Sequence, residues 1–276
     1  MEVKLIAMTD AVYENEPAGS VESAEQVCNH AAKTCTKEDA GDLAGQHYIV
    51  GEPCLIWEDK DLRPLGRALA SGHTSVAEHA VYTFEVKGVS RALTHQLVRH
   101  RVASYSQQSQ RYVRMAYSSR DCFDYVIPKS IWDNSEARAL YENHMKATAE
   151  IYGRLVDCYK LPMEDARYIL PNATCTNIIV TTNARELLHF FSLRCCERAQ
   201  WEIRELADKM LRICKEVSPT IFEDAGPSCV RDGFCRESKS CGRAPKLENV
   251  MEIMYEMDGE ASIRDEQRTA ERECHR

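Results

Sequence analysis

Two segments rich in β-branched and aromatic residues limit the folds open to this chain. In HAVYTFEVKG, apolar and polar side chains alternate from Ala80 to Lys87, which predicts a strand with one buried face. The run TCTNIIVTTN predicts another strand from Thr174 to Thr182, and a shorter strand is predicted from Val3 to Met8. Because strands and helices do not alternate regularly, the pattern favours an α+β fold, with a mixed or antiparallel sheet flanked by helices, over a doubly wound sheet.

Helices are predicted between and after these strands. Their expected ranges are 20–34, 61–70, 91–100, 130–159, 163–169 and 198–217. Ser90 is expected to cap the helix that starts at Arg91, and Asn183, with Glu186 three residues on, resembles a capping box that starts a further helix ending at Arg194. With 276 residues, 44% of them hydrophobic, the chain can bury a sizeable core. One domain is expected over residues 1–248, followed by a charged tail, 249–276.

A basic segment interrupts an otherwise acidic chain. The net charge is −8, yet seven Lys or Arg residues and no Asp or Glu lie between Lys87 and Arg120. Ser and Gln are interleaved with these cations, and such donors suit phosphate oxygens and planar carbonyl groups. The segment therefore predicts a pocket for an anionic ligand. The pI of about 5.7 argues against general affinity for duplex nucleic acid, which needs a broad basic surface.

An alternative is that the basic segment binds single-stranded nucleic acid. Tyr105, Tyr112 and Tyr117 would then be stacking platforms for bases. Binding that falls steeply with added salt, without any flavin, would favour this alternative.

The thirteen cysteines indicate reduced thiols. Their odd number and irregular spacing do not suit a disulfide framework. Cys229, Cys235 and Cys241 leave a zinc or redox sensor open as an alternative. Three cysteines with five residues between consecutive ones do not match structural zinc sites, so an ordinary loop is favoured. No run approaches the roughly 20 apolar residues of a membrane helix. The first residues lack the apolar region of a signal peptide, so a cytoplasmic location is expected, with no membrane partner.

Common nucleotide-binding and hydrolase motifs are missing. The sequence contains no GxGxxG, P-loop, HExxH or GxSxG element. A dinucleotide bound here would have to be held without a glycine-rich loop, for instance by arginines.

The segment RHRVASYSQQSQR fits the pattern R-H-R-x-x-S-x-x-x-x-S-x-R at every fixed position. It resembles the signature of the flavin-dependent thymidylate synthases. Further matching pieces are GHTSVAEH, MEDARYILP and TTNARELLHFFSLRCCERAQWEIR, so the resemblance covers roughly residues 72–221. The chain departs from the family at Ser106 and Gln107, where Asn and Glu are frequent, and at Arg198, where some relatives have His.

The resemblance implies a chemistry for the chain. It implies reductive methylation of dUMP to dTMP, with 5,10-methylenetetrahydrofolate as carbon donor, FAD as cofactor and NADPH as reductant. It also implies a homotetramer with active sites where subunits meet, and no cysteine nucleophile. No metal and no nucleic acid are expected as ligands.

The resemblance also implies site residues. Arg194 is expected to stabilise the activated uracil anion, as a guanidinium that stays protonated. The residues expected to bind FAD are Ser75, Arg99, His100, Arg101, Gln107, Asn183, Arg185 and His189. Those expected to bind dUMP are Gln96, Arg99, Gln107, Gln108, Ser109, Gln110, Arg111, Arg167 and Arg194.

Overall fold

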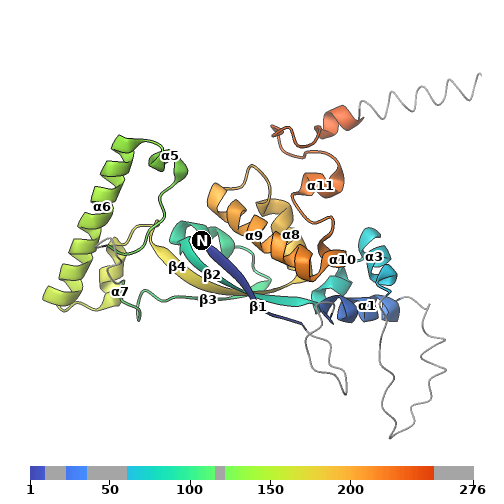
Figure 1. The fold of residues 1–276 in the computed structure, drawn as a ribbon, viewed down its shortest axis with the longest axis horizontal. Helices are drawn as coiled ribbons and strands as arrows, with labels where there is room; N and C mark the ends of the chain where they lie inside the picture. Colours follow the sequence, from blue (N-terminus) through green and yellow to red (C-terminus); the bar gives the residue numbers. More distant parts are fainter. Residues whose placement is uncertain (10–22, 36–60, 116–121, 252–276) are drawn as a thin grey trace, which may run out of the picture.

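A computed structural model describes residues 1–9, 23–35, 61–115 and 122–251. A four-stranded antiparallel sheet lies at its centre (Figure 1). The strands are β1 (Glu2–Met8), β2 (Val81–Ser90), β3 (Ala103–Gln107) and β4 (Cys175–Asn183), in the spatial order β1-β2-β4-β3. The predicted α+β class with an antiparallel sheet is confirmed.

Alternation along the strands gives the sheet one buried face. Tyr82, Phe84 and Val86 of β2 are fully buried, and Ile178 and Val180 of β4 lie beside them. The hydroxyl of Tyr82 donates to Ser218 at 2.7 Å, which satisfies the one polar atom of that side chain. The alternating pattern that predicted β2 therefore arises because only one face of the sheet packs against the core.

Two long helices cover this face (Figure 1). They are α8 (Ala184–Arg194) and α9 (Trp201–Val217), which pack on each other and on the sheet. The short helix α4 (Arg91–Leu97) lies between β2 and α9. At one end of the sheet, α1 (Ser23–Cys35), α3 (Arg63–Ala70), the 3-10 turn η2 (Thr74–His79) and α10 (Pro219–Phe222) form a second group, and α11 (Ser228–Asp232) packs on α8.

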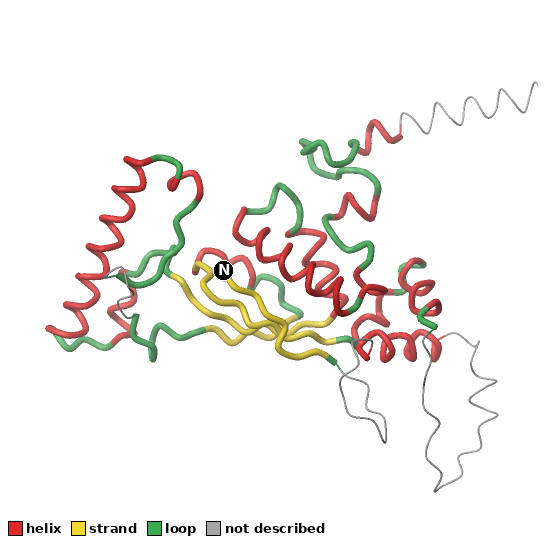
Figure 2. The backbone as a smooth tube through the Cα atoms, in the orientation of Figure 1, coloured by secondary structure: helices red, strands yellow, loops and turns green. Residues whose placement is uncertain are grey.

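A projection at the other end of the sheet, residues 122–170, is called the arm (Figure 2). It contains α5 (Lys129–Trp132), α6 (Ser135–Gly153), the π-helical turn η3 (Arg154–Cys158), α7 (Met163–Ala166) and the 3-10 turn η4 (Arg167–Ile169). The arm has its own small core, in which Cys122, Phe123, Met145 and Ala149 are buried. It is thus stabilised partly by contacts that do not involve the sheet.

Most predicted elements are present, with three differences. The helix predicted over 130–159 is split, because Asn134 accepts from the backbone N–H groups of Glu136 and Ala137 and starts a new helix. The helix predicted over 91–100 ends at Leu97, and the one predicted from Arg198 starts at Trp201. Ser90 and Asn183 cap their helices as predicted.

The third difference is β3. No strand was predicted in the signature segment, but Ala103–Gln107 pairs with Ile178–Thr182 as an edge strand. None of the helices in the described part of the chain is both long and apolar enough to cross a membrane. The predicted tail 249–276 lies almost wholly outside the described residues, and the domain limit stays a prediction.

Candidate active site

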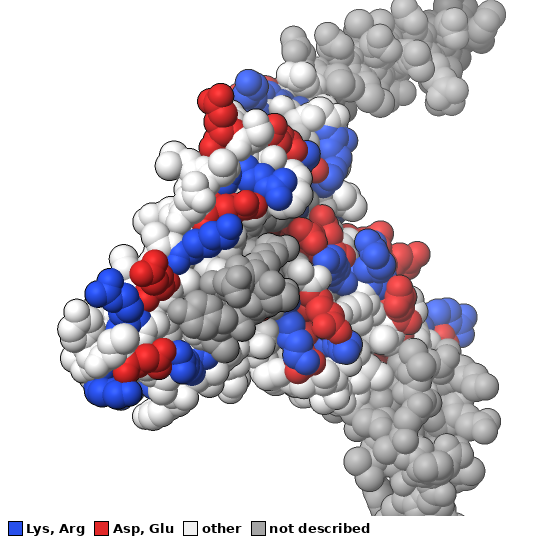
Figure 3. Space-filling model, turned by 60° about the vertical axis from the view of Figure 1, so that its left-hand side comes forward, with Lys and Arg blue, Asp and Glu red and all other residues white. Residues whose placement is uncertain are grey.

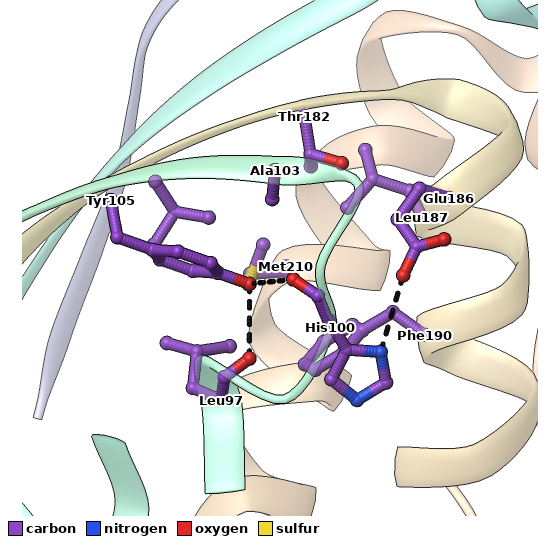
Figure 4. Close-up of a pocket in the computed structure, with 10 residues that line it drawn as sticks. Leu97, His100, Ala103, Tyr105, Thr182, Glu186, Leu187, Phe190 and Met210 are labelled. Atoms are coloured by element: carbon purple, nitrogen blue, oxygen red, sulfur yellow. Dashed lines mark hydrogen bonds and ion pairs between the residues drawn. The ribbon is translucent and has the colours of Figure 1, made fainter. Parts of the chain in front are cut away.

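A buried histidine from the signature lies at the junction of α4, β3 and α8. His100 is 7% exposed, and its ring packs edge-on against Phe190 with ring centroids 4.9 Å apart. Its Nδ1 lies 3.3 Å from Glu186 Oε1, as Figure 4 shows. On the other side, Arg194 Nε donates to His100 Nε2 at 3.1 Å. Because Nε2 accepts, the proton of the neutral ring is on Nδ1 and is donated to Glu186.

One face of α8 supplies all three partners of His100. Glu186, Phe190 and Arg194 are four residues apart and so lie on successive turns of the same face. Asn183 fixes the start of this helix by accepting from the Glu186 N–H at 2.9 Å. Sequence reasoning used Glu186 only as a cap residue; its spacing from Arg194 is the signal that marks a shared face.

Tyr105 fixes the turn before β3. Its hydroxyl donates to the carbonyl oxygens of Leu97 and His100, at 2.9 and 2.8 Å. Burial, followed by the nearby Glu186 carboxylate, raises the pKa of Tyr105 to about 12, so the donor is retained at neutral pH. The internal space beside Tyr105 and His100 measures only about 10 Å³ and has no room for a nucleotide or a flavin.

The environment of His100 favours its neutral form. Burial lowers the pKa of His100 below its usual 6.5, and Arg194 lowers it further, against the opposing effect of Glu186. Among the described residues, His100, Glu186 and His189 form the one group with three potential metal-ligand atoms within 4.8 Å of one another. Both ring nitrogens of His100 are already bonded, and the Arg194 guanidinium is adjacent, so this group is poorly suited to a cation.

Acidification is expected to destabilise the protein through His100. With its pKa lowered in the folded state, the unfolded chain binds a proton first, so the free energy of unfolding falls as the pH drops below 6.5 towards the folded-state pKa. Urea unfolding between pH 5 and pH 8 measures this slope. His100→Gln, which keeps polar atoms but does not titrate, should flatten it; an equal slope in the variant would contradict the assignment.

A cavity of about 650 Å³ lies beside a second face of α8. Four residues of α8 line it, at positions that share one face: Arg185, Leu188, His189 and Ser192. Thr74 of η2 and the start of α11 are on its other walls. The cavity volume is in the range of small-molecule sites. The structure thus brings Arg185 and His189, both predicted to bind FAD, to one cavity.

The remaining residues predicted to bind FAD are dispersed. Ser75 lines a separate cavity of about 410 Å³ between α1, α3 and η2. Arg99 and Arg101 flank His100 in sequence and are exposed, whereas His100 points inward. Gln96, predicted to contact dUMP, is half-buried on α4.

Hydrogen bonds to two threonines fix the side chain of Gln107. Its Nε2 donates to Thr94 Oγ1 at 3.0 Å and to Thr176 Oγ1 at 3.3 Å, and both threonines are buried. The neutral amide that replaces the family's frequent Glu therefore links α4 to β4. The next residue, Gln108, accepts from Asn177 Nδ2 at 3.1 Å and continues the pairing with β4.

Two of the arginines predicted to bind dUMP lie at the arm. Arg111 pairs with Glu164, its Nε 2.9 Å from Oε2, and Arg167 Nε donates to the Glu164 carbonyl at 3.1 Å. Ser109 Oγ accepts from the Arg111 N–H, and Gln110 lies half-buried between them. Arg91 lies close to Arg167. Burial lowers the pKa of Arg91, and the charge of Arg167 lowers it further.

Four of the predicted residues thus form two groups at opposite ends of β3. His100 and Arg194 lie near the start of the strand, and Arg111 and Arg167 lie beyond its end. The five residues of β3 alone separate the groups by roughly 16 Å. In this single chain, Arg194, predicted to stabilise the uracil anion, does not meet Arg111 and Arg167, which are predicted to bind dUMP.

The charge distribution does not favour the nucleic-acid alternative. In the basic segment, Lys87, Arg111 and Arg114 are neutralised by Glu85, Glu164 and Asp157. On the face shown in Figure 3, Lys and Arg side chains are interspersed with Asp and Glu. Tyr105 is bonded to the backbone, and Tyr117 and Arg120 lie outside the described residues.

Comparisons with known proteins agree with the signature. The family model described as thymidylate synthase complementing protein matches residues 19–220. A flavin-dependent thymidylate synthase of Geobacter sulfurreducens is 54% identical over 191 residues, covering 69% of this chain and 80% of the relative. One of Clostridium tetani is 43% identical over 247 residues, covering 82% and 92%.

The fold also matches a solved structure. The flavin-dependent thymidylate synthase of Helicobacter pylori, complexed with FAD and dUMP, aligns with a TM-score of 0.59 at 22% identity, over 82% of this chain and 100% of that one. The fold and family predicted from the sequence are therefore confirmed. On the extent of the family match and the identity to these relatives, this chain belongs to the flavin-dependent thymidylate synthases.

Proposed function

We propose that this chain methylates dUMP to dTMP, taking the carbon from 5,10-methylenetetrahydrofolate and reducing equivalents from NADPH through FAD. The observation that carries the proposal is the placement of Arg194. The guanidinium is half-buried, and its Nε donates a hydrogen bond to a neutral His100. Its two terminal nitrogens form no hydrogen bond with a described residue. A rigid cation with a free donor fork is what an activated uracil ring needs.

The cavity beside α8 fits part of FAD. Arg185, exposed and paired with Glu78, offers a cation for the pyrophosphate, and His189 offers a ring edge at the end of the cavity nearer His100. Asn183, Ser75, Arg99 and Arg101 would complete the set, together with Gln107 and His100 as positioning groups. FAD, when bound, supplies the hydride chemistry, while the protein supplies orientation and charge.

The group beside the arm fits a nucleotide phosphate. Arg111 and Arg167 converge on Glu164, which holds both in place until an anion competes for them. A dianionic phosphate would displace the Arg111 to Glu164 pair, because each exposed ion pair is weak on its own. Ser109, Gln108, Gln110 and Gln96 offer neutral donors for the sugar and base.

Arg194 acts on the base. Uracil C5 is a poor nucleophile until negative charge builds on the ring, with O2 and O4 carrying part of it. The terminal N–H groups of Arg194 would bond those oxygens where the charge develops. His100 accepts a hydrogen bond from Arg194 Nε, and Glu186 in turn accepts one from His100 Nδ1. The plane of the guanidinium is therefore fixed before the substrate arrives. Arg194 thereby provides positioned charge without transferring a proton itself.

The thiols near the site support a reaction without a cysteine nucleophile. Cys195, next to Arg194, is 3% exposed, and burial raises its pKa. Burial also raises the pKa of Cys175 to about 11. Both stay protonated at neutral pH, and a protonated thiol is a poor nucleophile.

We infer that complete sites form between subunits of a homotetramer. Arg194 is far from Arg111 and Arg167 within one chain. All three can belong to one site if one subunit supplies Arg194 and a neighbouring subunit supplies Arg111 and Arg167. The arm carries large exposed apolar residues, including Leu140 at 74% and Tyr168 at 83% exposure, which suit a subunit contact. A cytoplasmic location fits this metabolic role and remains a prediction.

The test of the proposed function is spectroscopic. Purified protein is expected to show a flavin spectrum, or to gain one with added FAD, and to bleach when NADPH is added without oxygen. Adding dUMP and methylenetetrahydrofolate should then restore the oxidised spectrum with formation of dTMP. A protein that binds no FAD, or bleaches without producing dTMP, would contradict the proposal.

A further inference from the structure

The chain after α10 returns over the turn between α8 and α9. Helix α11 ends at Gly233, whose φ of 75° is left-handed and lets the chain reverse. Farther on, Arg243 donates to the Cys195 carbonyl at 3.4 Å and pairs with Glu197 at 3.3 Å. These contacts fall on both sides of Cys196. The segment 228–246 is thereby fixed against the turn that contains Cys196.

A second contact joins the same two segments. Arg198 Nε lies 4.0 Å from Glu237 Oε2, so a residue two positions after Cys196 meets one two positions after Cys235. Cys235 is itself 8% exposed, and its N–H donates to the Pro245 carbonyl at 2.7 Å. Cys241 precedes Gly242, a second left-handed residue with φ of 90°. The loop is therefore built from defined turns that bring its cysteines back towards α8.

Four free cysteines lie on these two segments. They are Cys196 on the turn and Cys229, Cys235 and Cys241 on the returning segment. Burial raises the pKa of Cys229, Arg243 opposes this, and Cys235, Cys196 and Cys241 each raise it further. Cys196 lies between the two residues that Arg243 contacts, and Cys241 lies two residues before Arg243 in the chain.

We propose that Cys196, Cys229, Cys235 and Cys241 form a tetrathiolate site for a zinc ion. The sequence offered three cysteines at a spacing unlike that of structural zinc sites; the fold supplies the fourth from a distant turn. Four thiolates are a complete ligand set for Zn²⁺, and such a closed set is structural.

Zinc would draw the four sulfurs together. Among the described residues, only His100, Glu186 and His189 have three ligand atoms within 4.8 Å of one another, so the four sulfurs are more widely spread than in a closed site. Zinc binding would therefore tighten the segment 228–246 onto the turn after Arg194, in the way that metal binding is coupled to folding elsewhere. Coordination would also deprotonate the thiols.

The test uses the full, untagged chain under reducing conditions. After incubation with Zn²⁺ and dialysis, plasma mass spectrometry is expected to find one zinc per chain. Reconstitution with Co²⁺ should give thiolate-to-metal charge-transfer bands and the visible bands of a tetrahedral ion. Removing the metal with a chelator should expose four more thiols to a thiol reagent. A chain without stoichiometric zinc and without the charge-transfer bands would overturn the proposal.

Variants identify the ligands. Cys229→Ser and Cys241→Ser are each expected to weaken Co²⁺ affinity by at least about tenfold, since even second-shell changes cost that much. Cys158→Ser, which removes an exposed cysteine of the arm, is the matched control and should bind as the wild type does. Metal that survives both test substitutions but is lost in His189→Ala would place the ion on the histidine group and refute the tetrathiolate site. The wild-type cobalt spectrum decides the matter if a variant fails to fold.

Discussion

Arg194→Ala is expected to lower kcat for dTMP formation by about 10²–10³-fold, which corresponds to about 2.7–4 kcal/mol for one lost donor to a developing anion. FAD should remain bound, because Arg185 and His189 line their cavity from another face of α8. The fold should be kept as well, since the Arg194 side chain is half-buried and contributes one bond, to His100. The measurements are single-turnover dTMP formation and the flavin absorbance of the purified variant.

The matched control is Arg212→Ala, on an exposed face of α9, which should turn over as the wild type does. Arg194→Lys keeps a charge but loses the fork, so it should recover only part of the rate. Wild-type turnover by Arg194→Ala would remove this residue from the mechanism. Loss of FAD together with activity would instead make it a cofactor ligand.

Mixing two inactive variants tests whether sites are shared between subunits. Arg194→Ala and Arg111→Ala remove groups from opposite ends of β3, so a mixed assembly contains some sites in which both arginines are native. Co-refolding the two variants is expected to restore a fraction of the wild-type rate. If each chain holds a whole site, the mixture will stay as inactive as its components.

Glu202→Ala is expected to lower the free energy of unfolding by about 2–3 kcal/mol, because it leaves buried donors without a partner. Glu202 is 3% exposed and accepts from the Ser90 N–H at 2.8 Å and the Ser90 hydroxyl at 2.5 Å. It is also in the first turn of α9 and beside the start of α4, where an anion is favourable. Urea denaturation followed by circular dichroism measures the loss.

Two further variants test why Glu202→Ala is expected to lose stability. Glu202→Gln keeps an acceptor and should lose less than Ala, while Glu216→Ala, exposed on the same helix, should change stability by less than about 0.5 kcal/mol. Because Glu202 anchors the helix that precedes His100, the Ala variant should also lose activity at temperatures where it is still folded. Unfolding at the wild-type urea midpoint would show that the Ser90 bonds contribute little.

The elements predicted well are those whose cause is local. The strand β2 alternates because one face is buried, and Ser90 and Asn183 start helices because their side chains accept backbone N–H groups. The strand β3 was missed because ASYSQ has little β-branched or apolar content. Its pairing depends on β4, which is far away in sequence, so no local pattern marks it.

The same distinction holds for the site. The family resemblance marked His100 and Arg194 as site residues, but their contact joins α8 to the turn before β3 and is a tertiary feature. Gln107 was predicted to bind FAD and dUMP; its amide hydrogen bonds to two buried threonines depend on the tertiary fold and could not be predicted. The sequence could not predict that the turn containing Cys196 contacts the segment with the later cysteines, because only the fold brings the two segments together.

The antiparallel register of β3 makes the length of the signature segment critical to this protein. Tyr105 faces inward to the carbonyls of Leu97 and His100, while Ser104 and Ser106 face outward. Adding or deleting one residue between His100 and Gln108 would turn every later side chain of the strand to the opposite face. A serine would then take the place of Tyr105. The motif therefore tolerates substitution at its variable positions far better than any change in their number.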